Sequence, residues 1–256
     1  MVQAVLLRYT DPETCGNTVS SLYGALSEGR RAKADGIKDP EAFKTSVIAG
    51  RLLEKYLSKL TGTAPSGLSY EEDAGGRPRL SNLPDTDFNI SHTDGAVLAV
   101  FRSFSGPHGQ AFPCVGCDIE RVRSRFKKPY MPRSIIDRFF AEGEKELFEA
   151  LLNGEERFGK AAASGEFAAS GNSTEEELFF RFWTAKEAYG KMSGSGLSNI
   201  LGSDVIVINN GRMGYSDGTV LVSAHCGDLI MTFAIDRRLG NEPFVLTHDT
   251  VSGLTV

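Results

Sequence analysis

Apolar runs of strand length recur along the whole chain, but they do not alternate regularly with the longer helical patterns. The short runs predict strands over 2–8, 88–90, 96–104, 112–120, 205–208, 220–224 and 229–235. Near-helical spacing of apolar residues predicts helices over 19–34, 40–60, 134–152 and 178–192. A regular strand–helix–strand order would favour a doubly wound parallel sheet, so its absence predicts an α+β fold.

Size and charge limit the class of protein. With 256 residues, the chain can bury a substantial core as one large domain or as two lobes. A formal net charge of −5 argues against general affinity for nucleic acid. No apolar run reaches the length of a membrane span, and the first residues lack the basic and long apolar regions of a signal peptide. We therefore expect a cytoplasmic protein without a nucleic-acid or membrane partner.

The four cysteines are too few to form a disulfide framework in a chain of this size. Cys114 and Cys117 have the C-x-x-C spacing of a redox pair or of half a zinc site. A redox pair normally opens a helix after a strand, whereas this pair lies within a strand pattern, and no second pair completes a zinc site. Cys117 is therefore interpreted as a small apolar core residue, with a redox protein as a remote alternative.

An acidic pair ends the apolar run that begins near Phe112. Because side chains alternate between the two faces of a strand, Asp118 and Glu120 are expected to project together, while Cys117 and Ile119 face the other way. An Asp-x-Glu sequence at the end of a strand is often only solvated. The alternative is that both carboxylates belong to a site.

A second charged cluster lies within the predicted helix 178–192. Glu187 and Lys191 are four residues apart, which places them one turn apart on the same helix face. Such a pair can be a simple surface ion pair. Together with Asp118 and Glu120, however, Glu187 would complete a set of three carboxylates. Hard oxygen ligands of this kind suit Mg²⁺ bound beside a substrate phosphate.

Four motifs in a fixed order resemble those of a known family. They are Gly76-Arg77-Pro78, Phe88-Asn89-Ile90-Ser91-His92, Gly116-Cys117-Asp118-Ile119-Glu120 and Trp183-Thr184-Ala185-Lys186-Glu187 followed by Lys191. Their order and spacing resemble the signatures of 4′-phosphopantetheinyl transferases of the long, surfactin-synthetase-activating type, over roughly residues 26–200. One departure is that Ser46 stands where the family usually has an arginine, with Lys44 as a candidate substitute.

The resemblance implies a fold of two similar α+β lobes related by a pseudo-twofold axis. Each lobe would be a small, mostly antiparallel sheet packed with helices, and coenzyme A would bind between the lobes. We expect an N-terminal lobe at 1–110 and a C-terminal lobe at 111–256. The segment 153–177, rich in Gly, Ala, Ser and Glu and without sustained apolar periodicity, is predicted to be a mobile loop. Because the second lobe is built into the chain, the resemblance favours a monomer.

The resemblance also implies an activity and its partners. The enzyme would transfer the 4′-phosphopantetheine arm of coenzyme A to a serine hydroxyl of an apo acyl or peptidyl carrier protein and release adenosine 3′,5′-bisphosphate. Cleavage of a pyrophosphate needs charge neutralisation and in-line placement more than covalent help. We therefore expect dependence on Mg²⁺, with Mn²⁺ as the other candidate, and coenzyme A as co-substrate.

The motif positions give each residue an expected role. Asp118, Glu120 and Glu187 are the expected metal ligands. Glu187, directly or through a water, is the candidate base for the serine proton. Lys191, with Lys186, would steady negative charge on the leaving phosphate. Lys186 points about 100° away from Glu187 on an ideal helix, so Lys191 is favoured.

A second group of residues is expected to bind the nucleotide end of coenzyme A. Ser91 and His92 match family positions at the ribose 3′-phosphate, and Arg30 and Lys33 would complete that phosphate pocket. Arg77 lies in a turn expected to contact the adenosine portion. Two other interpretations stay open: a structural role for His92 and a solvated helix face for Arg30 and Lys33.

Clustered carboxylates also suit other functions. A Mg²⁺-dependent phosphohydrolase would use water as the acceptor and would need no carrier-protein surface. A non-catalytic module that binds coenzyme A or a carrier protein would tolerate the loss of a ligand position, yet Asp118, Glu120 and Glu187 are all present. The sequence does not identify the carrier protein served.

Overall fold

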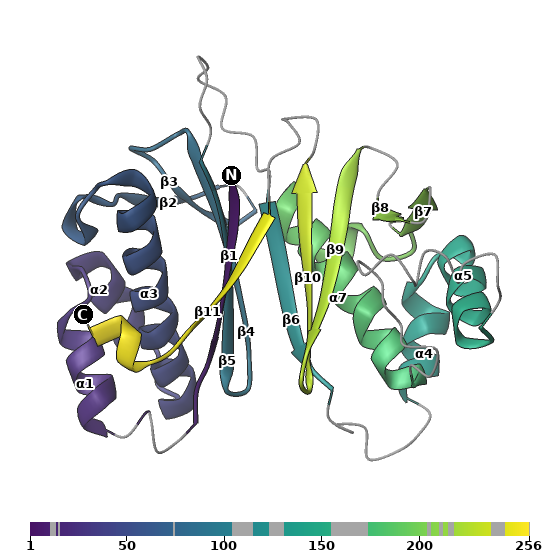
Figure 1. The fold of residues 1–256 in the computed structure, drawn as a ribbon, viewed down its shortest axis with the longest axis horizontal. Helices are drawn as coiled ribbons and strands as arrows, with labels where there is room; N and C mark the ends of the chain where they lie inside the picture. The colour runs from purple at the N-terminus through teal and green to yellow at the C-terminus, as the bar shows by residue number, and fades with distance from the viewer. Residues whose placement is uncertain are drawn as a thin grey trace. The chain divides into compact units, whose positions relative to one another are not determined.

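A computed structural model describes most of the chain (Figure 1). The described residues are 1–10, 14, 16–73, 75–103, 115–122, 131–154, 174–203, 206–209, 212–214, 218–236 and 244–255. The fold divides into two compact units. Unit 1 comprises residues 1–112 together with 242–256, and unit 2 comprises residues 113–241.

The sheet of unit 1 has four strands in the order β11-β1-β5-β4. Strand β1 (Val2–Arg8) pairs antiparallel with β5 (Ala96–Ser103), which pairs antiparallel with β4 (Thr86–Thr93). Strand β11 (Phe244–Asp249) lies parallel to β1 at the edge of the sheet. The strand predicted over 2–8 is confirmed. Strand β4 continues through Thr93, so Ser91 and His92 lie in a strand rather than in the connecting loop.

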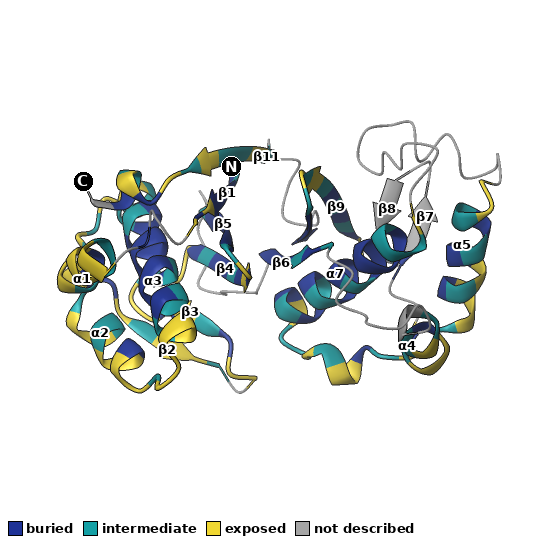
Figure 2. Ribbon diagram, turned by 90° about the horizontal axis from the view of Figure 1, so that it is seen from below, coloured by how far each residue is buried: buried dark blue, intermediate teal, exposed yellow. Residues whose placement is uncertain are grey.

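The helix α3 (Pro40–Thr61) packs against this sheet and forms the centre of the unit 1 core. The side chain of Asp39 accepts a hydrogen bond from Ala42 N, and Gly62 ends the helix in the left-handed conformation. Residues 50–54 of α3 are all buried, so the middle of the helix is enclosed on every side, and much of α3 is dark in Figure 2. The helix predicted over 40–60 is therefore present as α3, capped at both ends and buried in the core of unit 1.

Two short helices, α1 (Gly16–Gly24) and α2 (Glu28–Asp35), replace the single helix predicted over 19–34. The break falls at Ala25–Ser27. There the carbonyl of Ala25 and the N–H of Ser27 bond to side chains of α3 rather than within a helix. A short 3₁₀ turn, η1 (Pro65–Gly67), and the hairpin of β2 (Tyr70–Glu72) and β3 (Pro78–Leu80) follow α3.

The sheet of unit 2 has five antiparallel strands in the order β6-β10-β9-β8-β7. Strand β6 is Val115–Arg121, and its neighbour β10 is Leu229–Asp236. The remaining strands are β9 (Thr219–Cys226), β8 (Arg212–Gly214) and β7 (Val207–Asn209). Strands β9 and β10 match the sequence predictions closely, whereas β8 and β11 were not predicted.

The helix α7 (Glu175–Ser193) covers the sheet of unit 2. Thr174 and Glu177 form a reciprocal capping box at its start. The helix therefore begins three residues before the predicted start, inside the predicted mobile segment; residues 155–173 of that segment lie outside the described residues. The predicted helix 134–152 is two helices, α4 (Met131–Phe139) and α5 (Glu142–Leu152), because Glu144 bonds back to Ala141 N and starts a new helix.

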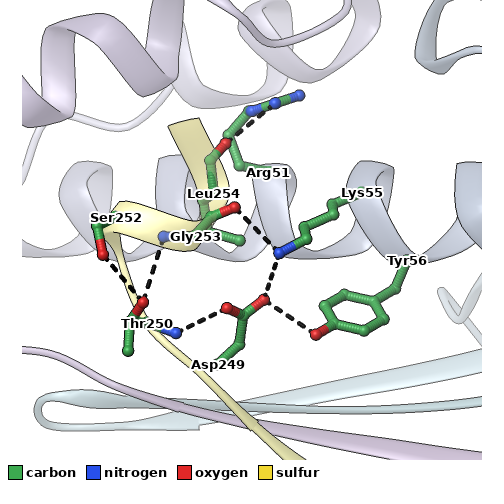
Figure 3. Close-up of polar contacts among 8 residues, drawn as sticks. All are labelled: Arg51, Lys55, Tyr56, Asp249, Thr250, Ser252, Gly253 and Leu254. Carbon is green, nitrogen blue, oxygen red and sulfur yellow. Dashed lines mark hydrogen bonds and ion pairs between the residues drawn. The ribbon is translucent and has the colours of Figure 1, made fainter. Parts of the chain in front are cut away.

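The last strand changes the expected division of the chain. Residues 111–256 were expected to form one lobe, yet β11 pairs with β1 and the 3₁₀ helix η4 (Ser252–Thr255) contacts α3. Lys55 Nζ donates to Asp249 Oδ2 at 2.8 Å and to Gly253 O at 3.0 Å, and Tyr56 Oη donates to the same Asp249 oxygen (Figure 3). The C-terminal residues thus belong to unit 1.

The predicted fold class is confirmed. Both units combine small, mostly antiparallel sheets with helices, as an α+β fold requires. The pseudo-twofold relation between lobes stays a prediction. Within the described part of the chain, no helix is long and apolar enough to cross a membrane.

Candidate functional site

The helix α7 lies so close to β6 that only glycine fits at one contact. A Cβ atom at Gly116 would lie 2.7 Å from Met192 N and 2.8 Å from Met192 Cβ, and closer still to the carbonyl oxygen of Ala188. Gly116 therefore faces α7. Because residues two apart in a strand share a face, Asp118 and Glu120 face α7 as well. Cys117 is fully buried but is not part of the core cluster that α7 forms, so burial alone does not test the predicted alternation.

The close approach brings the two charged clusters together. Lys191 Nζ lies 2.6 Å from Asp118 Oδ1. Burial lowers the pKa of Lys191, but the charge and hydrogen bond of Asp118, together with Cys117 and Glu187, raise the pKa by more, so the pKa of the lysine lies above its ordinary value. Burial raises the pKa of Glu187; Asp118 and Glu120 raise it further, and Lys191 offsets part of the rise. Three carboxylates and one ammonium group therefore share one electrostatic environment.

A chain of hydroxyl groups joins α7 to the sheet beside Asp118. Thr232 of β10, the strand neighbour of Asp118, lies 2.8 Å from Thr184 Oγ1 and 2.9 Å from Ser223 Oγ. Thr184 donates its only hydroxyl proton to Phe180 O at 2.8 Å, so Thr184 accepts from Thr232. Each of these hydroxyls is buried and satisfied, which fixes the helix on the strand. A single sequence holds no signal for this network beyond the Trp-Thr-x-Lys-Glu motif.

The carboxylates fit a divalent cation by charge, although they are not arranged around one. Among the described residues, no three His, Cys, Asp or Glu side chains lie close enough to enclose a metal ion. The ammonium group of Lys191 neutralises Asp118 instead. Burial and, after it, repulsion by Asp118 and Glu120 raise the pKa of Glu187, and a bound cation would relieve that repulsion. Asp118, Glu120 and Glu187 therefore fit the metal by their chemistry.

Lys186 occupies a different place from the one predicted. Its side chain is fully buried, with Nζ 2.5 Å from Glu144 Oε2 and 3.1 Å from Ser203 O. Glu144 is also fully buried and accepts from the N–H groups of Ala141 and Ile206. Because adjacent helical residues point about 100° apart, Lys186 is turned into the core while Glu187 is turned towards β6. The structure therefore gives Lys186 a buried carboxylate as partner, not a place beside Asp118.

A cavity of about 690 Å³ in unit 1 contains two of the predicted phosphate-binding residues, Arg30 and Lys33. The guanidinium carbon of Arg30 lies 4.1 Å from the ring centroid of Tyr70. Nε and Nη2 of Arg30 are buried and have no hydrogen-bond partner among the described residues. Lys33 Nζ lies 3.6 Å from Glu72 in an exposed pair. A buried donor group without an acceptor is a place where an anion could bind.

Arg77 and Lys44 are held by acidic neighbours. Nη2 of Arg77 donates to both carboxylate oxygens of Asp87, at 2.7 and 2.9 Å, and to Phe88 O. Lys44 Nζ lies 2.5 Å from Glu41. Neither residue lines the cavity around Arg30. Arg77 thus fixes the turn after β2 against β4 through its side chain.

Ser91 and His92 lie on opposite faces of β4. Phe88 belongs to the unit 1 core and Ile90 packs against it, so His92 shares the face of the sheet that α3 covers. Ser91 points to the other face and is buried, whereas His92 is exposed. The two side chains therefore do not converge on one point. Tyr70, which stacks on Arg30, was missed because no pattern distinguishes it from a core aromatic.

Comparison with known proteins identifies the family. A sequence model of the 4′-phosphopantetheinyl transferase superfamily matches residues 114–221, which include β6 and α7. The chain is similar to the 4′-phosphopantetheinyl transferase AcpT of Salmonella typhi, at 30% identity over 70% of this chain and 74% of that protein. It is 25% identical to the 4′-phosphopantetheinyl transferase Sfp of Bacillus subtilis (strain 168) over 82% of this chain and 78% of Sfp.

The extent of the match to AcpT shows that the chain belongs to the 4′-phosphopantetheinyl transferase superfamily. A second Bacillus subtilis relative, the 4′-phosphopantetheinyl transferase ffp, is 23% identical over 89% of this chain and 85% of its own length. The resemblance to the long, Sfp-like type is thereby confirmed.

Proposed function

We propose that this protein transfers the 4′-phosphopantetheine arm of coenzyme A to a serine hydroxyl of an apo acyl or peptidyl carrier protein and releases adenosine 3′,5′-bisphosphate. The observation that supports it best is the meeting of Lys191 with Asp118 at 2.6 Å, beside Glu187. A lysine and carboxylates at one point can manage both the charge of a phosphate and the proton of an attacking hydroxyl.

Each side chain of the cluster has a proposed role. Asp118, Glu120 and Glu187 would hold Mg²⁺ or Mn²⁺, and the bound ion would neutralise charge on the pyrophosphate. Glu187 accepts the serine proton, a role that suits a carboxylate whose pKa burial and its neighbours raise. Lys191 moves from Asp118 to the leaving phosphate and stabilises its negative charge. We further propose a cytoplasmic monomer, because the two cysteines in the described part of the chain, Cys117 and Cys226, form no disulfide and one chain carries both the cluster and the cavity.

The activity predicts a defined mass change. An apo carrier protein incubated with enzyme, coenzyme A and Mg²⁺ should gain one phosphopantetheine group, detected by intact-mass spectrometry. In Asp118→Asn, which keeps the shape of the side chain but not its charge, turnover should fall by about 10²–10³-fold. Hydrolysis of coenzyme A with no modification of fatty-acid, polyketide or peptide carriers would instead indicate a phosphohydrolase. Turnover near the wild-type level in Asp118→Asn would contradict the proposed cluster.

The cavity around Arg30 predicts selectivity for the ribose 3′-phosphate. Arg30 and Lys33 line the cavity and are the proposed partners of that phosphate, and His92, which does not line the cavity, is proposed from its motif position alone. Dephospho-coenzyme A should then bind the wild-type protein roughly one to two powers of ten more weakly than coenzyme A. In Arg30→Ala the preference should largely disappear, and His92→Ala should reduce it. Arg79→Ala is the control, because Arg79 is an exposed arginine paired with Glu71. Calorimetric titration of both compounds measures the four preferences, and an unchanged preference in Arg30→Ala would exclude this assignment.

A further inference from the structure

A buried ion pair within α3 is the starting point. Glu54 is fully buried, Arg51 is 9% exposed, and Arg51 Nη1 lies 3.2 Å from Glu54 Oε2. A buried carboxylate is costly unless a cation and hydrogen-bond donors surround it. The charge of this pair is therefore retained in the core of unit 1 only because each oxygen of Glu54 has a donor.

One of those donors lies at the start of another helix, and the other is Arg51 itself. Ser27 N donates to Glu54 Oε1 at 2.9 Å, and Arg51 Nη1 donates to Ala25 O at 3.2 Å. Ser27 is the N-cap of α2, and its own side chain makes no capping bond. The first turn of α2 is consequently fixed by α3, through one buried pair, rather than by its own cap. Arg30 lies in that first turn.

Packing at the same place leaves α2 little freedom. A Cβ atom at Gly50 would lie 2.9 Å from Leu26 Cδ2 and 3.8 Å from Arg30 Cδ, so the start of α2 lies directly against α3. Burial raises the pKa of Tyr70, Arg30 offsets part of that rise, and Glu54 adds to it. Glu54 is therefore close enough to Tyr70 to interact with it electrostatically, and the guanidinium group of Arg30 lies over the ring of the same tyrosine.

Arg51 of this pair also bonds to the C-terminal segment of unit 1. Arg51 Nη2 donates to Leu254 O at 3.2 Å, one helical turn from the bonds of Lys55 to Asp249 and Gly253 (Figure 3). The guanidinium group of Arg51 thus joins three segments: η4, α3 and the α1–α2 turn.

We propose that Arg51 and Glu54 are positioning residues of the cavity around Arg30. The two residues hold the first turn of α2 so that Arg30 presents its unpaired nitrogens to a phosphate. This inference rests on the proposed function, because it takes the anion to be the 3′-phosphate of coenzyme A. Neither residue touches the ligand; each acts through the placement of Ser27 and Arg30.

The test is the preference for coenzyme A over dephospho-coenzyme A in Glu54→Gln. This change keeps the shape of the side chain but removes its charge and turns one acceptor into a donor. The preference should fall about tenfold, with the affinity for dephospho-coenzyme A nearly unchanged. Lys55→Met is the matched control, because Lys55 is the next residue of α3 and holds the C-terminal segment without contacting α2. It should retain the wild-type preference.

A second variant separates placement from stability. Arg51→Lys keeps the positive charge but cannot bond Ala25, Glu54 and Leu254 together, so it should also reduce the preference. Unfolding midpoints are measured for every variant, since a pair that served stability alone would lower the midpoint without changing the preference. This inference would be overturned, and the proposed function left standing, if Glu54→Gln and Arg51→Lys both kept the wild-type preference for coenzyme A over dephospho-coenzyme A while Arg30→Ala lost that preference. Full preference in Arg30→Ala as well would overturn both.

Discussion

The Lys186→Met variant is expected to have a free energy of unfolding about 3–5 kcal/mol lower than the wild-type protein. The reason is the fully buried partner: without the ammonium group, Glu144 would remain in the core of unit 2 with only backbone donors. Denaturant unfolding monitored by the Trp183 fluorescence measures the change. The affinity of the folded variant for coenzyme A should stay within about twofold of wild type, because Lys186 stabilises the core and does not contact the substrate.

Two controls make this result specific. Lys145→Met removes a partly exposed lysine paired with the exposed Glu142 on the same helix as Glu144, and should cost less than about 1 kcal/mol. The double variant Lys186→Met/Glu144→Leu replaces both charges by apolar groups and should be more stable than Lys186→Met. A stable Lys186→Met variant with a large loss of coenzyme A affinity would restore the role first predicted for Lys186.

The Gly116→Ala variant should lose most of its activity. The added methyl group would meet the backbone of α7 at Ala188 and Met192, so the helix must move away from β6. That movement would separate Lys191 from Asp118, and overpacking of this kind typically costs about 1–3 kcal/mol. We expect turnover to fall at least about tenfold, since misplacement by about 1 Å can cost 10²-fold.

An equivalent change elsewhere provides the control. Gly24 ends α1, and a Cβ atom there would meet nothing within 4 Å. Gly24→Ala should therefore keep wild-type turnover in the carrier-protein assay. If Gly116→Ala also kept wild-type turnover, the close contact of α7 with β6 would not be what aligns the cluster.

The cluster in unit 2 could be predicted because strand and helix periodicities are local. Alternation along β6 gives the common face of Asp118 and Glu120, and a spacing of four gives the common face of Glu187 and Lys191. The partner of Lys186 could not be predicted in the same way. Glu144 is forty-two residues away in the sequence, and only tertiary packing decides which of two adjacent helical residues faces a core.

The predictions for unit 1 failed where distant contacts override local pattern. Gly24 and Ser27 are local signals for a helix end and a helix start that the prediction of one helix over 19–34 passed over. The groups that bond at the break belong to Arg51 and Glu54 of α3, which no local pattern within 19–34 indicates. Likewise, the strand predicted over 88–90 stopped before Ser91 and His92, yet pairing with β5 extends the strand through them. Alternation along that strand then separates the two side chains.

The pairing of β11 with β1 has a consequence for how the chain is made. Unit 2 is continuous in sequence, whereas the edge strand of unit 1 follows it. During synthesis, β1, β5 and β4 can pair with one another, but the outer edge of β1 has no partner until β11 follows unit 2 out of the ribosome. We therefore expect unit 2 to complete its sheet before unit 1 does, with the outer edge of β1 as the surface most exposed to wrong pairing in the meantime.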